Sequence, residues 1–222
     1  HGVIGTLHNL RHRSTEELEA ELLRHAPETP MSLVLPCLYS ELEGDALTGI
    51  VDKLAKVPYL EEIIIGLDAA DREQFERARD FFSKLPQQHS ILWNDGPRLL
   101  EIDRRLTTEN LSPLERGKGR NVWYCLGYFL ASARSKVVAL HDCDILTYER
   151  DMPARLFYPL VHPDMDYVFC KGYYYRAAQG RLNGRVFRLL VTPLIQALQK
   201  TTGNNEYLSY MGSFRYALSG EF

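Results

Sequence analysis

The sequence predicts an α/β protein with a mainly parallel central sheet, built as a single domain over residues 1–222. Two observations favour this class. Short apolar runs rich in β-branched residues, such as Met31–Leu38 and Glu61–Asp68, alternate with segments of helical periodicity. The 222 residues, 45% of them hydrophobic, also suffice for one large buried core. Because strands that alternate with helices pair in parallel through right-handed crossovers, a mainly parallel sheet is expected.

The N-terminal half supplies most of the expected elements. Helices are expected at 14–25, 45–57, 71–85 and 122–133, and strands at 31–38, 61–68, 89–93 and from 136 toward 147. Ser14-Thr15-Glu16-Glu17 has the form of a capping box, which predicts the start of the first helix. Pro36 lacks a backbone N–H, so it is tolerated only at the end or edge of a strand. The first strand is therefore expected to end near Leu38.

The remaining segments are less periodic. Asp95–Arg116 shows no helical or strand period, which predicts a long polar loop able to act as a lid. A short helix is expected at 152–159, an aromatic strand at 166–176, a helix at 186–200 that breaks near Pro193, and a last strand at 213–221.

Composition excludes several classes of function. A net charge of −3 and a pI near 6.2 leave no basic face broad enough for nucleic acid or an anionic membrane. No apolar run approaches the roughly 18 residues of a membrane span. The four cysteines form no C-x-x-C pair, which suits buried thiols in a reducing compartment and argues against structural zinc. We therefore expect a soluble, cytoplasmic protein without a nucleic-acid or membrane partner.

The strongest chemical signal is Asp142-Cys143-Asp144, at the end of an apolar run. On an extended chain, alternation places both carboxylates on one side and Cys143 on the other. Two carboxylates at the end of a buried strand can hold a divalent cation together with a diphosphate. The alternative is that two acidic residues merely end a strand, and the tripeptide alone does not decide between them.

A second signal is Asn183-Gly184-Arg185-Val186, which opens an expected helix. Free N–H groups at a helix start, with a forked arginine beside them, suit the oxygens of a phosphate. Lys171 and Arg176 on the preceding segment add positive charge, which favours a small phosphorylated acceptor. The alternative for Arg185 is an arginine that is merely exposed in a turn. For Lys118, the alternative is a solvated lysine in a loop.

Five motifs together resemble those of the glucosyl-3-phosphoglycerate synthases, which are retaining GT-A glycosyltransferases. The motifs are Leu35-Pro36-Cys37-Leu38, Gly117-Lys118-Gly119, Asp142-Cys143-Asp144, Asn183-Gly184-Arg185-Val186 and Ser219-Gly220-Glu221. Their order and spacing match from about residue 31 to the last residue. Mannosylglycerate synthase is similar over residues 31–145. The resemblance implies a GT-A (Rossmann-like nucleotide-diphospho-sugar transferase) fold and, as is usual in that family, a homodimer.

The resemblance also implies a division of the chain and a set of site residues. Residues 1–30 would form an N-terminal arm and helix, 31–145 the nucleotide-sugar half, and 146–222 an acceptor half with its C-terminal part missing. The implied nucleotide-sugar ligands are Pro36, Leu38, Glu41, Asp68, Lys118, Asp142 and Glu221. The implied acceptor ligands are Lys171, Arg176, Gly184, Arg185 and Val186. Asp144 would bind Mg²⁺ or Mn²⁺ directly, Asp142 would reach the ribose or a metal-bound water, and a further ligand is expected beyond Phe222.

The function expected from the resemblance is glucose transfer from UDP- or GDP-glucose to 3-phosphoglycerate. No catalytic nucleophile is assigned. The sequence leaves open a mannosylglycerate synthase-like transferase using GDP-mannose and glycerate, a sugar nucleotidyltransferase, and a non-catalytic nucleotide-sugar-binding module. A nucleotidyltransferase should carry a glycine-rich loop after its first strand, and Leu35–Glu41 contains no glycine. The chain also departs from the family pattern at Ala69-Ala70 and at Phe187, where the family has Ser-Gly and threonine.

Overall fold

The computed structural model describes residues 7, 13–113, 115–165, 167–172, 177–178, 181–182, 187–203 and 208. The chain divides into two compact units, and each is described by itself. The sheet unit comprises residues 13–170, and the second unit comprises residues 1–12 and 171–222. Organisation as a single domain over residues 1–222 stays a prediction.

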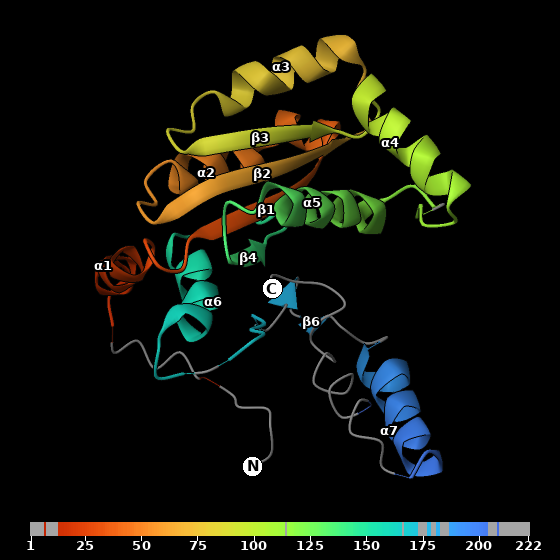
Figure 1. The fold of residues 1–222 in the computed structure, drawn as a ribbon. Coiled ribbons are helices and arrows are strands. Elements are labelled where there is room, and N and C mark those ends of the chain that lie inside the picture. Colours follow the sequence, from red (N-terminus) through yellow and green to blue (C-terminus); the bar gives the residue numbers. More distant parts are fainter. Residues whose placement is uncertain are drawn as a thin grey trace. The chain divides into compact units, whose positions relative to one another are not determined.

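Four parallel strands form the centre of the sheet unit (Figure 1). They are β1 (Met31–Leu38), β2 (Leu60–Asp68), β3 (Gln88–Trp93) and β4 (Val137–Leu140), in the order β3-β2-β1-β4. Every strand pair in this sheet is parallel, which confirms the expected topology. The carboxyl ends of all four strands therefore lie along one edge of the sheet.

Helices cover both faces of the sheet. Alternate residues of β1 face opposite layers: Leu33 and Leu35 belong to a large core, and Val34 to a smaller one. The large core is completed by α1 (Thr15–His25), α2 (Asp45–Leu54), α3 (Arg72–Phe82) and α6 (Asp151–Val161). The smaller core lies under α5 (Lys118–Ser132), which contributes Cys125. The sheet therefore lies between two helical layers. Of the helices that supply these two cores, only α5 lies on the face of the smaller core.

The predicted caps and strand ends explain where several elements begin and stop. Ser14 accepts from the Glu17 N–H and Glu17 accepts from the Ser14 N–H, so the predicted capping box is present. Pro36 lies inside β1, although β1 is a central strand. Pairing with β4 ends at Val34, whose carbonyl accepts from the His141 N–H. Because Pro36 faces the same side as Val34, its missing N–H falls where the β4 ladder has already stopped.

The predicted polar loop at Asp95–Arg116 is wrong. The structure has helix α4 (Pro97–Thr108) there, with Gly96 as its N-cap and Pro97 in its first turn. Proline is favoured at that position because its missing N–H would have no helical partner. None of the α4 residues is buried. Leu99, Ile102 and Leu106 do have helical spacing, a pattern that the sequence prediction overlooked among the charged residues of this segment.

Two other boundaries differ from the expectations. Helix α5 begins at Lys118, four residues before the predicted start, so Gly117-Lys118-Gly119 forms its N-terminus rather than a separate loop. Strand β4 ends at Leu140, and residues 143 and 144 form a turn. A short 3₁₀ helix, η1 (Tyr39–Glu43), follows β1. The described part of the expected strand at 166–176, residues 167–172, is not a strand.

The second unit contains a small hairpin and a helix. Strands β5 (Ala177–Ala178) and β6 (Arg181–Leu182) pair antiparallel. A π-helical turn, η2 (Phe187–Val191), leads into α7 (Thr192–Thr201), which has Pro193 in its first turn. The break expected near Pro193 is therefore present, because proline fits a helix start and not its interior. The expected last strand at 213–221 lies outside the described residues.

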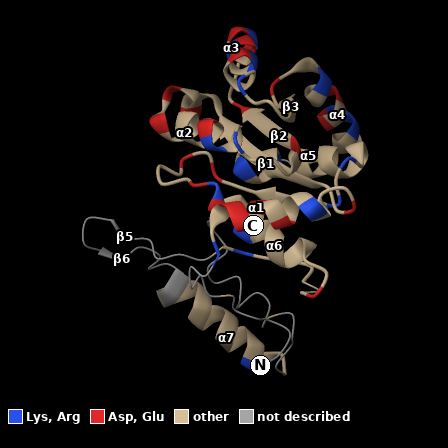
Figure 2. Ribbon diagram, turned by 90° about the vertical axis from the view of Figure 1, so that its left-hand side faces the viewer, with Lys and Arg blue, Asp and Glu red and all other residues tan. Residues whose placement is uncertain are grey.

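Among the described residues, no helix is long and apolar enough to cross a membrane. Acidic and basic residues are interspersed along the helices around the sheet, as the ribbon colours of α2, α3 and α4 show in Figure 2. Ion pairs such as Arg77–Glu73 and Arg105–Glu101 connect neighbouring turns of these helices.

Candidate functional site

The site predicted from the sequence is centred on the carboxyl edge of the sheet. Leu38 and Asp68 are the last residues of β1 and β2, and they are partners in the parallel register. Asp142 follows β4 by two residues, on the other side of β1. Because parallel strands end at one edge, residues that are about 30 and 70 positions apart in the chain meet there.

The N-terminus of α5 brings Lys118 to this edge. The Lys118 ammonium donates a hydrogen bond to the Asp142 carboxylate. The Asp142 side chain is only 15% exposed, whereas that of Lys118 is 54% exposed. Gly117, the N-cap of α5, has φ 137°, a left-handed conformation that favours glycine. The sequence Gly-Lys-Gly therefore turns the chain so that Lys118 starts the helix next to the acidic segment.

Glu41 lies close to the same acidic segment. Its carboxylate accepts a 2.7 Å hydrogen bond from the Leu38 N–H, which holds η1 against the end of β1. Burial raises the pKa of Glu41, and the negative charge of Asp144 raises this pKa further, while the Leu38 N–H and the Lys118 charge oppose the increase. Glu41, Lys118, Asp142 and Asp144 therefore form one electrostatically connected group.

The oxygen donors of this group suit a hard divalent cation. Asp144 is exposed to solvent and Asp142 is partly buried, so one carboxylate is open and the other is held in place by Lys118. Mg²⁺ and Mn²⁺ prefer carboxylate and water oxygens, and Mg²⁺ is commonly bound by one or two carboxylates plus phosphate oxygens. The crowding of Asp144 against Glu41 shows excess negative charge that a cation would neutralise. These residues therefore fit the expected metal.

The turn after β2 fixes Asp68. Ala69 has φ 55°, and the next residue, Ala70, is held on both sides of its backbone. Its N–H donates to Asp95 at 3.2 Å, and its carbonyl accepts from the Trp93 indole at 2.7 Å. Two alanines thus form a tight turn where the resembled family has Ser-Gly. The hydrogen bonds from Trp93 and to Asp95 hold the backbone of this turn in place.

A further ionic cluster, which the sequence did not reveal, joins α4 to α5. Asp103 of α4 accepts from Arg120 at 3.1 Å, from Ser112 at 2.5 Å and from Tyr124. Hydrogen bonds from Ser112 and Tyr124, followed by the Arg120 charge, lower the pKa of Asp103 despite some desolvation. Burial lowers the pKa of Arg120, but Tyr124, Asp103 and Asp68 together raise it above its ordinary value. Arg120 therefore connects α4 electrostatically to the end of β2.

His141, which directly precedes the acidic tripeptide, is completely buried. Burial lowers its pKa to about 3, so the ring is neutral at ordinary pH. Neither ring nitrogen has a hydrogen-bond partner among the described residues, and the ring packs edge-on against Tyr148 at 5.3 Å. His141 therefore has a packing position under the site.

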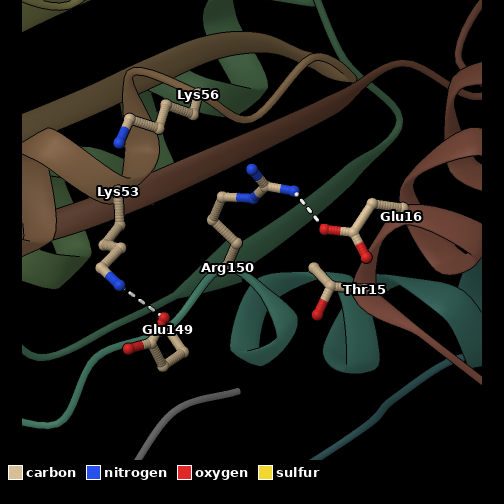
Figure 3. A pocket seen from close by; sticks show the side chains of 6 residues that line it. All are labelled: Thr15, Glu16, Lys53, Lys56, Glu149 and Arg150. Atoms are coloured by element: carbon tan, nitrogen blue, oxygen red, sulfur yellow. Dashed lines mark hydrogen bonds and ion pairs between the residues drawn. The ribbon is translucent and has the colours of Figure 1, made fainter.

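A shallow polar pocket lies elsewhere on the sheet unit (Figure 3). It is lined by Thr15, Glu16, Lys53, Lys56, Glu149 and Arg150. Arg150 pairs with Glu16 at 3.3 Å and with Glu19 at 2.8 Å, and Lys53 pairs with Glu149 at 2.6 Å. None of the predicted site residues lines this pocket. Its ion pairs connect α1 and α2 to the segment that follows the acidic tripeptide.

The structure places the predicted residues unevenly. Pro36, Leu38, Glu41, Asp68, Lys118, Asp142 and Asp144 all lie in the sheet unit, at or next to its carboxyl edge. Lys171 is partly buried and belongs to the second unit. Arg176, Gly184, Arg185, Val186 and Glu221 lie outside the described residues. The described nucleotide-sugar and metal candidates therefore share one edge of the sheet, and the roles of all the candidate residues stay predictions.

Comparison with known proteins supports the sequence interpretation. The glucosyl-3-phosphoglycerate synthase of Persephonella marina is 48% identical over 221 residues, which are 100% of this chain and 55% of that protein. That of Methanococcoides burtonii is 40% identical over 197 residues, or 87% of this chain and 48% of the relative. The chain is related to glucosyl-3-phosphoglycerate synthases. The predicted resemblance is thus confirmed, although the chain spans only about half the length of these relatives and matches no known family model.

Solved structures show the same fold at lower identity. Glucosyl-3-phosphoglycerate synthase from Mycobacterium tuberculosis, in complex with Mn²⁺, UDP and glucosyl-3-phosphoglycerate, is 21% identical with a TM-score of 0.58. The match covers 97% of this chain and 62% of that one. The same protein in complex with Mn²⁺ and UDP-glucose gives a TM-score of 0.56, with 91% and 58% coverage. The predicted GT-A fold class is therefore confirmed.

Proposed function

We propose that this chain belongs to a metal-dependent retaining glucosyltransferase that transfers glucose from UDP-glucose to 3-phosphoglycerate, with residues 31–145 binding the nucleotide sugar and residues from 146 onward binding the acceptor. The observation that carries the proposal is the group formed by Glu41, Lys118, Asp142 and Asp144 at the carboxyl edge of the sheet. Relatives named glucosyl-3-phosphoglycerate synthase, and structures of one with Mn²⁺ and UDP-glucose, support the same activity.

Different residues of the chain would bind different parts of the nucleotide-sugar donor. Pro36, Leu38 and Asp68 end the two central strands and would line the nucleoside, with Glu41 at its rim. Lys118 carries a positive charge at the start of α5 and would stabilise the negative charge that develops on the departing diphosphate. Because the helix start adds its own free N–H groups, this end of α5 is suited to phosphate oxygens.

A divalent cation, Mg²⁺ or Mn²⁺, would be held by Asp144 directly, with Asp142 reaching the ribose or a metal-bound water. When bound, it supplies Lewis-acid stabilisation of the diphosphate leaving group. The hydrogen bond from Lys118 to Asp142 would hold the Asp142 carboxylate in one orientation before the substrate binds. Positioning of donor and acceptor on one face is then the main catalytic contribution of the protein.

We assign the acceptor to Lys171, Arg176, Gly184, Arg185 and Val186, with Glu221 near the donor, on the sequence pattern. A charge-assisted hydrogen bond to a phosphate is worth about 1.5–3 kcal/mol. Arg185→Ala should therefore raise the KM for 3-phosphoglycerate roughly 10- to 100-fold and leave donor affinity unchanged. Equal use of glycerate by the wild-type protein, or an unchanged acceptor KM in the variant, would instead favour a mannosylglycerate synthase-like enzyme.

The metal and donor assignments are tested with the full-length protein, radiolabelled UDP-glucose and 3-phosphoglycerate. Asp144→Asn should abolish nearly all Mg²⁺-dependent transfer, Asp142→Asn should be less severe, and Asp164→Asn, at an 89% exposed side chain, is the matched control. Near-normal turnover of Asp144→Asn at saturating Mg²⁺ would refute the metal assignment. Release of pyrophosphate when UTP and glucose 1-phosphate replace these two substrates would point to a nucleotidyltransferase.

We also propose a cytoplasmic homodimer. The cysteines of the described residues are all free, which suits a reducing compartment. Sedimentation of the full-length protein at micromolar concentration tests the dimer, and a monomer there would refute it.

A further inference from the structure

Three residues of the sheet unit bring sulfur and oxygen donors together next to the acidic tripeptide. Cys37 is the penultimate residue of β1, Glu41 lies in η1, and Cys143 follows β4. One Sγ, one carboxylate oxygen and the second Sγ all lie within 4.8 Å of one another. Cys37 and Glu41 are four residues apart, whereas Cys143 lies in a distant segment of the chain, so the fold brings its sulfur to the other two donors.

The two thiols are shielded from solvent and the carboxylate is not. Cys37 is 0% exposed and Cys143 is 2% exposed, and both belong to the large core on the α2 and α6 face. The Cys37 thiol donates a 3.2 Å hydrogen bond to the Leu38 carbonyl. Glu41 is partly exposed, so it forms the open side of the group. A small ion could therefore enter past Glu41, at the carboxyl edge of the sheet.

The donor set differs in kind from that of Asp142 and Asp144. Thiolate ligands select Zn²⁺ and other thiophilic ions, whereas Mg²⁺ and Mn²⁺ prefer oxygen. Sulfur lies about 2.3 Å from a tetrahedral zinc, so two such sulfurs are about 3.8 Å apart. The two sulfurs therefore need to approach each other by at most about 1 Å to reach that geometry.

We propose that Cys37, Glu41 and Cys143 form a binding site for a thiophilic divalent cation, Zn²⁺, distinct from the magnesium site of Asp142 and Asp144. Binding releases both thiol protons to solvent, and two thiolates with one carboxylate coordinate the ion, leaving a fourth position for water. The site carries a net charge of −1 when loaded. The Lys118 charge, which already acts on Glu41, offsets this remainder.

Occupancy of this site has a consequence for the acidic tripeptide. Cys143 stands between Asp142 and Asp144, so an ion on its sulfur fixes the turn that carries both carboxylates. Coordination also competes with the hydrogen bond from the Leu38 N–H to Glu41. If the transferase activity proposed above is correct, Zn²⁺ should inhibit it in the presence of Mg²⁺. The binding itself does not depend on that activity.

The decisive measurement is X-ray absorption of the full-length wild-type protein loaded with one equivalent of Zn²⁺ in excess Mg²⁺, which occupies the oxygen site. Two sulfur scatterers at about 2.3 Å are expected. A shell of nitrogen and oxygen alone would overturn the proposal. This measurement needs no variant, so a folding defect cannot obscure it.

Titration with Zn²⁺ against a chelating dye tests which residues bind. Cys37→Ser and Cys143→Ser should each weaken Zn²⁺ affinity at least tenfold, and Glu41→Gln should weaken it less. The matched control is Cys170→Ser, at a partly buried cysteine outside the group. Co²⁺ should give a thiolate-to-metal charge-transfer band in the wild type and in the control that is lost in both cysteine variants. Equal affinity in all proteins, or a band that survives Cys37→Ser and Cys143→Ser, would refute the assignment.

Discussion

Replacing Gly66 by alanine should separate β2 from α5. A Cβ at Gly66 would lie 1.8 Å from the Asn121 Oδ1, 2.6 Å from the Cys125 Sγ and 2.8 Å from the Asn121 Cγ. The Asn121 amide also donates a 2.8 Å hydrogen bond to the Gly66 carbonyl, in a fully buried position. Because the side chains of Asn121 and Cys125 fill the space, the added methyl can be accommodated only if the helix moves.

The cost follows from two terms. Overpacking a closed core costs about 1–3 kcal/mol, and the loss of the Asn121 hydrogen bond costs about 1 kcal/mol. Gly66→Ala should therefore lower the free energy of unfolding by about 2–4 kcal/mol, measured by urea denaturation with an unchanged m-value. The displacement would also move the N-terminus of α5, so Lys118 should lose its contact with Asp142.

The matched control is Gly127→Ala on α5, where nothing lies within 4 Å of the added Cβ. Alanine in that helix should stabilise the protein by about 0.5–1 kcal/mol. The double variant Gly66→Ala/Asn121→Ala should be less destabilised than the sum of its single variants, because the shorter side chain removes two of the three clashes. A Gly66→Ala protein within about 0.5 kcal/mol of wild type would refute this account of the β2–α5 contact.

Three further predictions follow from the sheet unit. Because the pKa of His141 is about 3 in the folded protein and about 6.5 when unfolded, the unfolded chain binds the extra proton between these values. Stability should therefore fall by up to about 1.4 kcal/mol per pH unit as pH decreases from 6.5 toward 3, and His141→Leu should flatten this part of the unfolding profile relative to His89→Leu. Lys118→Met should lower kcat/KM for transfer roughly 10- to 100-fold, with the exposed Lys136→Met as control; equal losses in both variants would show a nonspecific charge effect. Backbone amides of α4 should exchange more slowly than those of residues 109–113, as measured by hydrogen exchange, and uniform fast exchange over 97–113 would support the mobile loop that the sequence favoured.

Much of the sheet unit follows from local sequence patterns. The strand and helix segments are set by periodicity, and the start of α1 by a capping box, because these depend on neighbours within a few residues. The parallel topology follows from the alternation of strands and helices. Helix α4 escaped prediction because its apolar residues Leu99, Ile102 and Leu106, although at helical spacing, lie among many charged residues and none of them is buried.

The candidate site was determined partly by the sequence and partly by the tertiary structure. Residue type and position at a strand end identified Asp142 and Asp144 as candidates, since parallel strands end at one edge, and the family resemblance of Gly117-Lys118-Gly119 identified Lys118. Only the folded chain brings Lys118 into a hydrogen bond with Asp142 and places Asp144 where its charge raises the pKa of Glu41. The meeting of Cys37 with Cys143 is likewise invisible in the sequence, because 105 residues separate them and only the adjacency of β1 and β4 joins them. Such contacts depend on strand order and on how far each strand extends, and local propensity sets neither.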